Sequence, residues 1–420
     1  MRLHDQIERL KKSKDGKTLA SNMVYLSLLQ IAGYLFPLIT MPYLARVIGA
    51  EGFGKIAFAT AVITWIQTIA DWGFNYTATR DVAKNRDDAQ KVSEIFSRVL
   101  WSRCLLALVS LIVLIGLIAA IPTFRENALL ILFTFLLVPG HILYPDWFFQ
   151  AIEKMKYITI LGVLIKFIFT LLVFLLIREK SDYIYQPLII SFGYLCSGVI
   201  ALYFILVKWK VRVHRVALQD IFTTIKSSTN VFLNNLMPNL YNSFSVILLG
   251  FFGTPTHTGY YDAGKKLTTL SNTAMSVIAR AFFPFLSRRI DKHRFYRTFS
   301  LAVSGMLTVL LVILAPWLIR FFFGGEFVSS VRVLQITALA VFFVCMNEVY
   351  GTNYLIVNGK DRIMRNITLV SSLIGFALAF PLIYYFKHIG AAVVYTFSSF
   401  LLGLLPALYA RKYGLNKQNG

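Results

Sequence analysis

The chain has 420 residues, of which 57% are hydrophobic and only 15% are charged, and its formal net charge at pH 7 is +22. A soluble domain normally carries about 25% charged residues, so this composition excludes a water-soluble enzyme. It predicts an all-α, polytopic integral membrane protein, in which the excess of basic residues reflects topology rather than nucleic-acid binding.

Twelve apolar stretches are long enough to span a membrane as helices. The first six fall at about 22–45, 54–76, 97–121, 127–150, 157–177 and 183–207. The second six fall at about 230–252, 259–286, 298–323, 328–357, 363–386 and 388–410. Twelve spans of about 21 residues leave room for short loops and for no sizeable soluble domain.

The distribution of basic residues predicts the orientation of these spans. With the N-terminus inside, about 28 of the 42 Lys and Arg residues fall in inner segments and about seven in outer ones. Because basic residues accumulate on the cytoplasmic side, both termini are predicted to be cytoplasmic. The predicted outer loops are all short, which excludes a membrane glycan polymerase or ligase with a large outer catalytic loop.

A polar segment near the middle divides the chain into two halves. The prediction is a cytoplasmic arm at 1–21, a six-helix lobe at 22–207, a cytoplasmic linker at 208–229, a second six-helix lobe at 230–410 and a cytoplasmic tail at 411–420. A shift of 207 residues aligns Ser21 with Ser228 and Val24 with Val231. The two lobes are therefore expected to be a parallel repeat with a pseudo-two-fold axis along the membrane normal.

Three spans carry polar residues at steps of three and four, which places each series on one helix face. The second span has Thr60, Thr64, Gln67, Asp71 and Asn75. The seventh has Asn230, Asn234, Asn239, Asn242 and Ser245. The eighth has Asp262, Lys265, Lys266, Thr269, Asn272, Ser276 and Arg280.

A charged side chain at the bilayer centre costs at least about 2.5–3.5 kcal/mol, so these faces are not expected to meet lipid. Hydrogen bonds between helices would account for a single Asn or Thr. The whole series on the eighth span favours a hydrated cavity instead. There, Lys265, Lys266 and Arg280 outnumber Asp262, which predicts an anionic guest.

Other charges within the spans have two interpretations. Lys166 lies midway along the fifth span and is either a cavity residue or the partner of a carboxylate such as Glu348. Arg98 and Arg103 fall in the first turns of the third span, where they are expected to extend to the cytoplasmic surface.

No pattern typical of an enzyme stands out. The three cysteines are far apart and the six histidines are scattered, so neither a disulfide framework nor a metal site is predicted. The segment at 49–55 has the spacing of a phosphate-binding loop, but Ile56 replaces the metal-binding Ser or Thr and no strand precedes it. The expectation is a protein that is not an enzyme and that uses no cofactor.

Three motifs resemble a known family. Asp-Trp-Gly-Phe-Asn at 71–75 resembles the second-span signature of O-antigen flippases of the Wzx type. Pro-Asp-Trp-Phe-Phe-Gln at 145–150 is similar to that family's fourth-span exit. Gly-Tyr-Tyr-Asp-Ala-Gly-Lys-Lys at 259–266 is similar to its eighth-span beginning, which the multidrug/oligosaccharidyl-lipid/polysaccharide exporter superfamily shares more widely.

The resemblance implies a function. Such proteins move an undecaprenyl-diphosphate-linked oligosaccharide from the inner to the outer leaflet of the bacterial plasma membrane, by alternating access of two lobes. Lipopolysaccharide O-antigen or a related surface polysaccharide repeat unit would be the cargo. Membrane lipids, a glycan polymerase and a chain-length regulator are the partners it implies. The alternative is a cation-coupled multidrug exporter of the same superfamily.

Candidate residues follow from the polar series together with the resemblance. The expected contacts of diphosphate or sugar acid are Lys265, Lys266, Arg280 and Lys166. Those of sugar hydroxyls are Asn234, Asn239, Asn242, Asn272, Gln67 and Asn75. Candidates for ion coupling or charge balance are Asp71, Asp262 and Glu348, and the candidate salt-bridge gate is Arg80 with Asp81. No catalytic or metal-binding residue is predicted.

Overall fold

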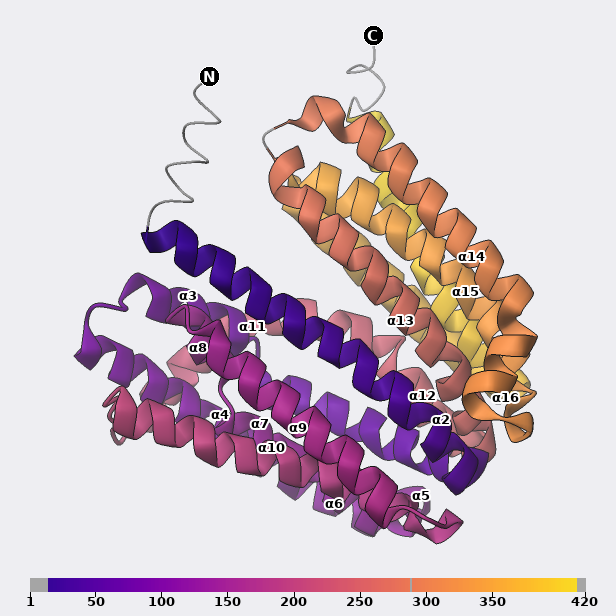
Figure 1. The fold of residues 1–420 in the computed structure, drawn as a ribbon, viewed down its shortest axis with the longest axis horizontal. Helices are drawn as coiled ribbons and strands as arrows, with labels where there is room; N and C mark the ends of the chain where they lie inside the picture. Colours follow the sequence, from indigo (N-terminus) through magenta and orange to yellow (C-terminus); the bar gives the residue numbers. More distant parts are fainter. Residues whose placement is uncertain (1–13, 288, 414–420) are drawn as a thin grey trace. The chain divides into compact units, whose positions relative to one another are not determined.

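The computed structural model describes residues 14–287 and 289–413, and every regular element in this part of the chain is a helix (Figure 1). The all-α prediction is thereby confirmed. Most of the predicted N-terminal arm, at 1–13, and most of the predicted tail, at 414–420, lie outside the described residues.

The first half of the chain forms ten helical segments after the arm. They are α2 (Lys14–Asp71), α3 (Phe74–Lys84), α4 (Ala89–Ala120), α5 (Pro122–Glu126), α6 (Ala128–Phe135), α7 (Leu137–Leu143), α8 (Asp146–Ala151), α9 (Met155–Leu176), η1 (Lys180–Ile184) and α10 (Tyr185–Tyr203). A π-helical turn, η2 (Phe204–Lys208), ends this half. Residues 209–217 then run without helix.

The second half begins with α11 (Leu218–Leu236), the short turn η3 (Met237–Leu240) and α12 (Ser243–Phe252). It continues with α13 (Pro255–Leu286), η4 (Ile290–Lys292), α14 (His293–Phe323), η5 (Gly325–Phe327), α15 (Ser330–Met346), η6 (Asn347–Ile356) and α16 (Asp361–Lys412). In Figure 1, α14, α15 and α16 run side by side, and α13 packs against α15.

Eight helices in the described part are long and apolar enough to cross a membrane. Two long helices are broken: α2 at Gly49 (φ 67°) and α16 at Lys387 (φ 48°). Both breaks fall where the sequence predicts turns between consecutive spans. Outside the eight, α12 is shorter and α13 carries the polar series. The count of twelve spans and the repeat remain predictions.

The chain divides into two compact units. Unit 1 holds Met1–Met41, Ile66–Arg178 and Ile184–Leu233, and unit 2 holds Pro42–Trp65, Glu179–Tyr183 and Asn234–Gly420, so α2 contributes to both. The core of unit 1 includes Trp147 and Phe148, whose ring centroid lies 5.3 Å from that of Phe96. Unit 2 has two buried clusters, one around Tyr296 and one around Tyr261.

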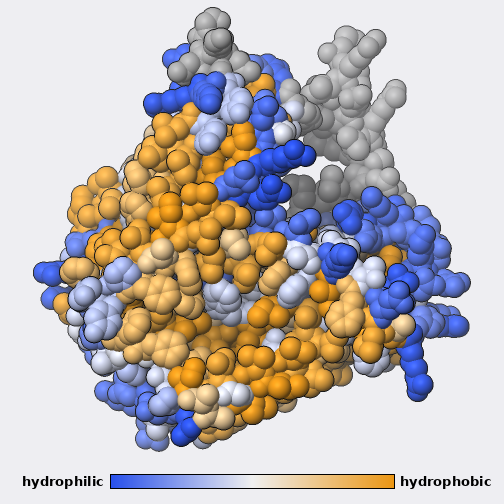
Figure 2. Space-filling view, turned by 180° about the vertical axis from the view of Figure 1, so that it is seen from behind, coloured by the Kyte–Doolittle hydropathy of each residue, from blue (hydrophilic) through white to orange (hydrophobic). Residues whose placement is uncertain are grey.

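Long helix faces in both units expose large apolar side chains. Ile112 on α4 and Ile313 on α14 are 62% and 67% exposed. Figure 2 shows hydrophobic residues covering broad continuous areas of one face, with hydrophilic residues collected at their margins. Apolar surface of this extent is typical of a protein that contacts lipid. Helices can do so because they satisfy their own backbone hydrogen bonds in the bilayer.

Labelling can test the predicted orientation. Glu51→Cys and Lys180→Cys, in exposed positions on the predicted outer side, are expected to react with a membrane-impermeant maleimide in spheroplasts. Arg215→Cys and Asp361→Cys, exposed on the predicted inner side, are expected to react only after permeabilisation. Each would be made in a background without the three native cysteines. Reaction of all four in sealed cells would contradict the predicted topology.

Two glycines set the close crossing of α2 and α13 within unit 2. A Cβ on Gly54 would collide with the Pro255 carbonyl oxygen, and one on Gly259 with the Ala50 carbonyl oxygen. The obstructing atoms are backbone, so a side chain cannot move them aside cheaply. The crossing therefore fixes the first turns of α13, which begin at the Thr254 N-cap.

Gly259→Ala is expected to destabilise unit 2 by about 1–3 kcal/mol, the usual cost of overpacking. The measurement is the thermal unfolding midpoint of the purified protein in detergent. Gly116→Ala in α4 is the matched control, because the added Cβ would have no atom within 4 Å besides its chain neighbours and the nearby backbone of its own helix. Equal midpoints for both variants would show that the crossing tolerates a wider separation.

Candidate functional site

Lys265, on α13, is the cation with the most distinctive surroundings in unit 2. Its Nζ donates a hydrogen bond of 3.1 Å to Oδ1 of Asn242, the N-cap residue of α12. The same Nζ lies 4.7 Å from the centre of the Tyr395 ring and 5.3 Å from that of Tyr261. Aromatic faces and a neutral amide stabilise an ammonium without cancelling its charge. Among the described residues, no carboxylate forms an ion pair with Lys265.

Asn272 lies two helical turns after Lys265 on the same face of α13. Its Nδ2 donates to Oη of Tyr395, on α16, at 3.0 Å. Its Oδ1 is buried and has no partner, and neither has the buried Oη of Tyr261. Buried polar atoms are normally hydrogen-bonded, so these two have hydrogen-bonding capacity that this conformation leaves unused.

We call Lys265, Asn242, Tyr261, Asn272 and Tyr395 the α13 polar site. Three of its members, Asn242, Lys265 and Asn272, were predicted from the sequence to line one cavity, and they come from two different predicted spans. It also contains two tyrosines that sequence reasoning missed, because aromatic residues in an apolar span resemble core.

Lys266 and Asp262 lie beside this site but are occupied with each other. Lys266 Nζ is 2.6 Å from Asp262 Oδ2 and lies 4.0 Å from the centre of the Phe53 ring. The pair has no net charge. The positive excess predicted for the start of α13 is therefore carried by Lys265.

Arg280 is separated from Lys265 by fifteen residues of α13, which is about 22 Å at 1.5 Å per residue. It is exposed, and its guanidinium donates to the backbone oxygen and the hydroxyl of Ser276 at 3.3 and 3.2 Å. The Arg280 guanidinium interacts electrostatically with the carboxylate of Glu348, which is half-buried in η6. The structure thus divides the predicted cationic series of α13 between two separate places.

The predicted seventh span, 230–252, is not one continuous helix, and its asparagines do not share one face as expected. Pro238 lies in η3 between α11 and α12, and the Asn242 side chain donates to the Pro238 carbonyl oxygen at 3.0 Å. Proline cannot donate a backbone hydrogen bond, which ends the helix here. Of the predicted residues, Asn234 is exposed on α11, Asn239 lies in η3, and Asn242 reaches Lys265.

In unit 1, the motif at 71–75 forms a break between α2 and α3. Trp72 (φ 40°) and Gly73 (φ 78°) have left-handed backbone, which glycine adopts readily and tryptophan rarely. The Trp72 ring stacks on Phe232 at 3.8 Å between centroids. A Cβ on Gly73 would meet Val231 at 2.8 Å, so α11 packs directly against the break.

Asp71 at this break forms an ion pair with Arg103 of α4. The expectation that Arg103 extends to the surface is wrong: the residue is only 3% exposed. Arg98 is exposed as expected, 3.9 Å from Asp220. The reason is that α4 begins at Ala89 rather than near 97, which places Arg103 about 21 Å along the helix at 1.5 Å per residue. Nε and Nη1 of Arg103 are buried without a partner.

His141 and Asp146 belong to the same polar cluster of unit 1. The Asp71 carboxylate and the Arg103 guanidinium interact electrostatically with the His141 and Asp146 side chains. The His141 ring stacks on Tyr194 at 4.2 Å, and Asp146 Oδ1 accepts a hydrogen bond from the Trp147 backbone at the start of α8. Of the two carboxylates, Asp71 forms the ion pair with Arg103, whereas Asp146 accepts its hydrogen bond from the Trp147 backbone.

The remaining predicted residues of unit 1 lie apart from this cluster or at its border. Gln67 is half-buried on α2, and Asn75, on α3, has a buried Oδ1 with no partner. Lys166 is half-buried on α9, and no ion pair to it occurs in the described residues. The alternative pairing of Lys166 with Glu348 stays a prediction, because the two residues belong to different units.

Arg80 and Asp81, the predicted gate, are adjacent and exposed, with Nε 2.9 Å from Oδ1. Asp81 also lines a cavity of about 170 Å³ between α3, α4 and α11. Hydroxyls dominate its polar lining: Thr77, Thr223, Thr224, Ser227 and Ser228. Within the described residues, no group of three or more His, Cys, Asp or Glu is placed to hold a metal ion.

Comparison with known proteins agrees with this architecture. The chain is 28% identical over 402 residues to a protein of Escherichia coli (strain K12) named "Putative O-antigen transporter", covering 94% of this chain and 97% of that protein. A Shigella dysenteriae protein of the same name is 27% identical over 395 residues, covering 91% and 98%.

Two solved structures share the fold at low sequence identity. Lipid II flippase MurJ in an inward closed conformation superposes with a TM-score of 0.74 at 12% identity, covering 91% of this chain and 87% of that one. An inward-facing multidrug resistance transporter of the MATE family, from the MOP superfamily, gives 0.63 at 14% identity, covering 95% and 99%. The model of the family described as "Polysaccharide biosynthesis protein" matches residues 19–290, which is more than half of the chain. The chain therefore belongs to the polysaccharide biosynthesis protein family.

Proposed function

We propose that this protein is a flippase that moves a lipid-linked oligosaccharide across the bacterial plasma membrane. The cargo is an O-antigen or related repeat unit on undecaprenyl diphosphate, carried from the inner to the outer leaflet. The observation that carries this proposal is the α13 polar site. It joins a cation without an ion-pair partner to an amide, two tyrosines and two unsatisfied polar atoms.

The chemistry of the site suits this cargo. A diphosphate needs a cation or charge-assisted hydrogen bonds, which Lys265 Nζ supplies. Sugar hydroxyls both donate and accept, and they match the Asn272 Oδ1 and the Tyr261 Oη that lack partners. Family membership and the relatives named for O-antigen transport support the same class of cargo.

We further propose the mechanism and setting that the sequence predicted. Two six-helix lobes, 22–207 and 230–410, alternate access without an enzymatic step or cofactor, and both termini are cytoplasmic. Lys166, Gln67 and Asn75 would contribute from the first lobe, and Arg280 and Asn239 from the second. Arg80 and Asp81 would act as a gate, and a glycan polymerase and a chain-length regulator would receive the product.

A second candidate is a cation-coupled multidrug exporter. Its support is the cluster of unit 1, where Asp71 and Asp146 outnumber Arg103 and could attract a cation. Asp71 of this cluster also suits a coupling role in a flippase, and Asp262 and Glu348 of unit 2 are the other charge-balance candidates. The unpaired charge of Lys265 argues against a cationic drug as cargo, because like charges repel in a desolvated site.

Deletion of the gene in its host distinguishes these functions. A flippase predicts that complete lipid-linked repeat units accumulate on the cytoplasmic leaflet and that surface polysaccharide is lost. Unchanged surface polysaccharide with altered sensitivity to cationic dyes would reject the flippase and favour the exporter.

A further inference from the structure

Residues 209–217, which follow η2, form an extended segment that we call the strap. The strap lies along one face of α4 and is held there by side chains at four-residue intervals. Arg212 N donates to Ser93 Oγ at 3.1 Å, and His214 N donates to Ser97 Oγ at 2.9 Å. The indole of Trp101 donates to the His214 carbonyl oxygen at 3.0 Å. The backbone of the strap is therefore fixed against a transmembrane helix.

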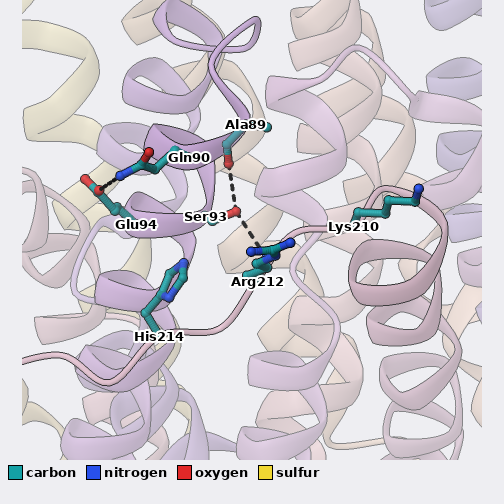
Figure 3. A pocket seen from close by; sticks show the side chains of 7 residues that line it. All are labelled: Ala89, Gln90, Ser93, Glu94, Lys210, Arg212 and His214. Carbon is teal, nitrogen blue, oxygen red and sulfur yellow. Dashed lines mark hydrogen bonds between the residues drawn. The ribbon is translucent and has the colours of Figure 1, made fainter.

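Lys210, Arg212 and His214 occupy alternate positions of the strap, while Val211 between them is buried. All three line a cavity of about 730 Å³, whose other wall is the first two turns of α4 (Figure 3). The chain reaches this geometry through left-handed backbone at Lys210 (φ 54°), which is uncommon for a residue other than glycine.

The cavity has a positive charge that the described residues do not neutralise. No ion pair is formed by Lys210, Arg212 or His214 within the described part of the chain. Glu94 is the acid that lines the cavity, and its carboxylate accepts a hydrogen bond from Gln90 Nε2 at 3.3 Å (Figure 3). Lys210 and Arg212 both line the cavity, and an ammonium and a guanidinium are groups that bind a phosphate by charge-assisted hydrogen bonds.

The surroundings of the cavity place it at the edge of a lipid-facing surface. Trp101 is 43% exposed, and tryptophan is enriched at the headgroup level of membranes. Further along α4, Leu108, Val109 and Ile112 are exposed and apolar, as expected of residues that meet acyl chains. A phosphate bound between Lys210 and Arg212 would thus belong to a molecule with a hydrocarbon tail beside α4.

We propose that the strap cavity binds the phosphate of a lipid headgroup, with Lys210 and Arg212 as its main ligands. Two molecules carry this chemistry: an anionic phospholipid of the bilayer and a polyprenyl diphosphate carrier. The residues of this site belong to unit 1, and those of the α13 polar site belong to unit 2. Phospholipid binding would stand whether or not the protein is a flippase, whereas carrier binding rests on that proposed function.

The test uses the purified full-length chain and two probes, phosphatidylglycerol and farnesyl diphosphate. Native mass spectrometry from phosphatidylcholine nanodiscs that contain phosphatidylglycerol counts the lipids retained, and titration with farnesyl diphosphate measures competition. The double variant Lys210→Gln with Arg212→Gln is expected to weaken retention of the binding probe at least tenfold. Arg215→Gln with Lys226→Gln removes the same charge from exposed residues that do not line the cavity, and is expected to bind like the wild type.

The two probes separate the sources. Retention of phosphatidylglycerol that farnesyl diphosphate does not displace identifies a phospholipid site, and displacement identifies a carrier site. If Lys210→Gln with Arg212→Gln binds each probe as well as the control double variant does, the proposal is overturned. Lys210→Gly is the variant least prone to misfold, because glycine accepts the left-handed backbone at this position. Weakened binding with an unchanged unfolding midpoint supports Lys210 as a ligand. Unchanged binding by this variant removes Lys210 from the site.

Discussion

Replacing Lys265 with alanine is expected to lower glycan export by a factor of about 10 to 150 while leaving the protein inserted in the membrane. The factor follows from losing one hydrogen bond to a charged group, which contributes about 1.5–3 kcal/mol. Within the described residues no other cation replaces Lys265 in contact with both Asn242 and Tyr395. The measurement is surface polysaccharide in a deletion strain that expresses each variant at the same level.

Two control variants make this result interpretable. Lys266→Ala removes a cation that is already paired with Asp262 at 2.6 Å, so a smaller loss of export is expected. Lys265→Arg keeps the charge and should retain part of the activity. The double variant Lys265→Ala with Lys266→Ala is expected to abolish export. Normal export by the double variant would show that the α13 polar site does not bind the cargo.

Replacing Arg103 with methionine is expected to destabilise unit 1 by about 3–5 kcal/mol, because it leaves the Asp71 carboxylate without its buried partner. The double variant Arg103→Met with Asp71→Leu removes both charges and is expected to recover most of the stability. The measurement is the free energy of unfolding of the purified protein in detergent.

The control for this cycle is Arg98→Met, on the same helix. Arg98 is exposed and 3.9 Å from Asp220, so its removal is expected to cost no more than about 1 kcal/mol. If the double variant is as unstable as Arg103→Met alone, the two side chains do not stabilise the fold as a pair. Interaction energies between contacting residues are usually about 0.5–3 kcal/mol, which this cycle can resolve.

The periodicity of α13 is the part of the site that sequence reasoning predicted best. Asp262, Lys265 and Asn272 recur at helical steps, and a single continuous helix keeps them on one face. Tyr395 belongs to α16, 130 residues further along the chain. Its contact with Lys265 depends on how two distant helices pack, and no local pattern in the sequence encodes that.

The errors arose where hydropathy alone was used to place helix ends. The apolar run of the third span starts near 97, but Asp88 caps the helix by accepting hydrogen bonds from the backbone of Gln90 and Lys91. An aspartate at this position is an N-cap signal that would have moved the start and placed Arg103 deep inside. Pro238 likewise signals the break in the predicted seventh span, which its polar periodicity concealed.

Transport in a purified system tests the central claim most directly. The protein would be reconstituted in liposomes with a lipid-linked oligosaccharide, and a glycosidase outside the vesicles would report the glycan that reaches the outer leaflet. The account predicts that wild-type protein exposes glycan well above the protein-free rate and that Lys265→Ala falls to near that rate. No exposure by the wild type, or equal exposure by both proteins, would contradict a flippase that works through the α13 polar site.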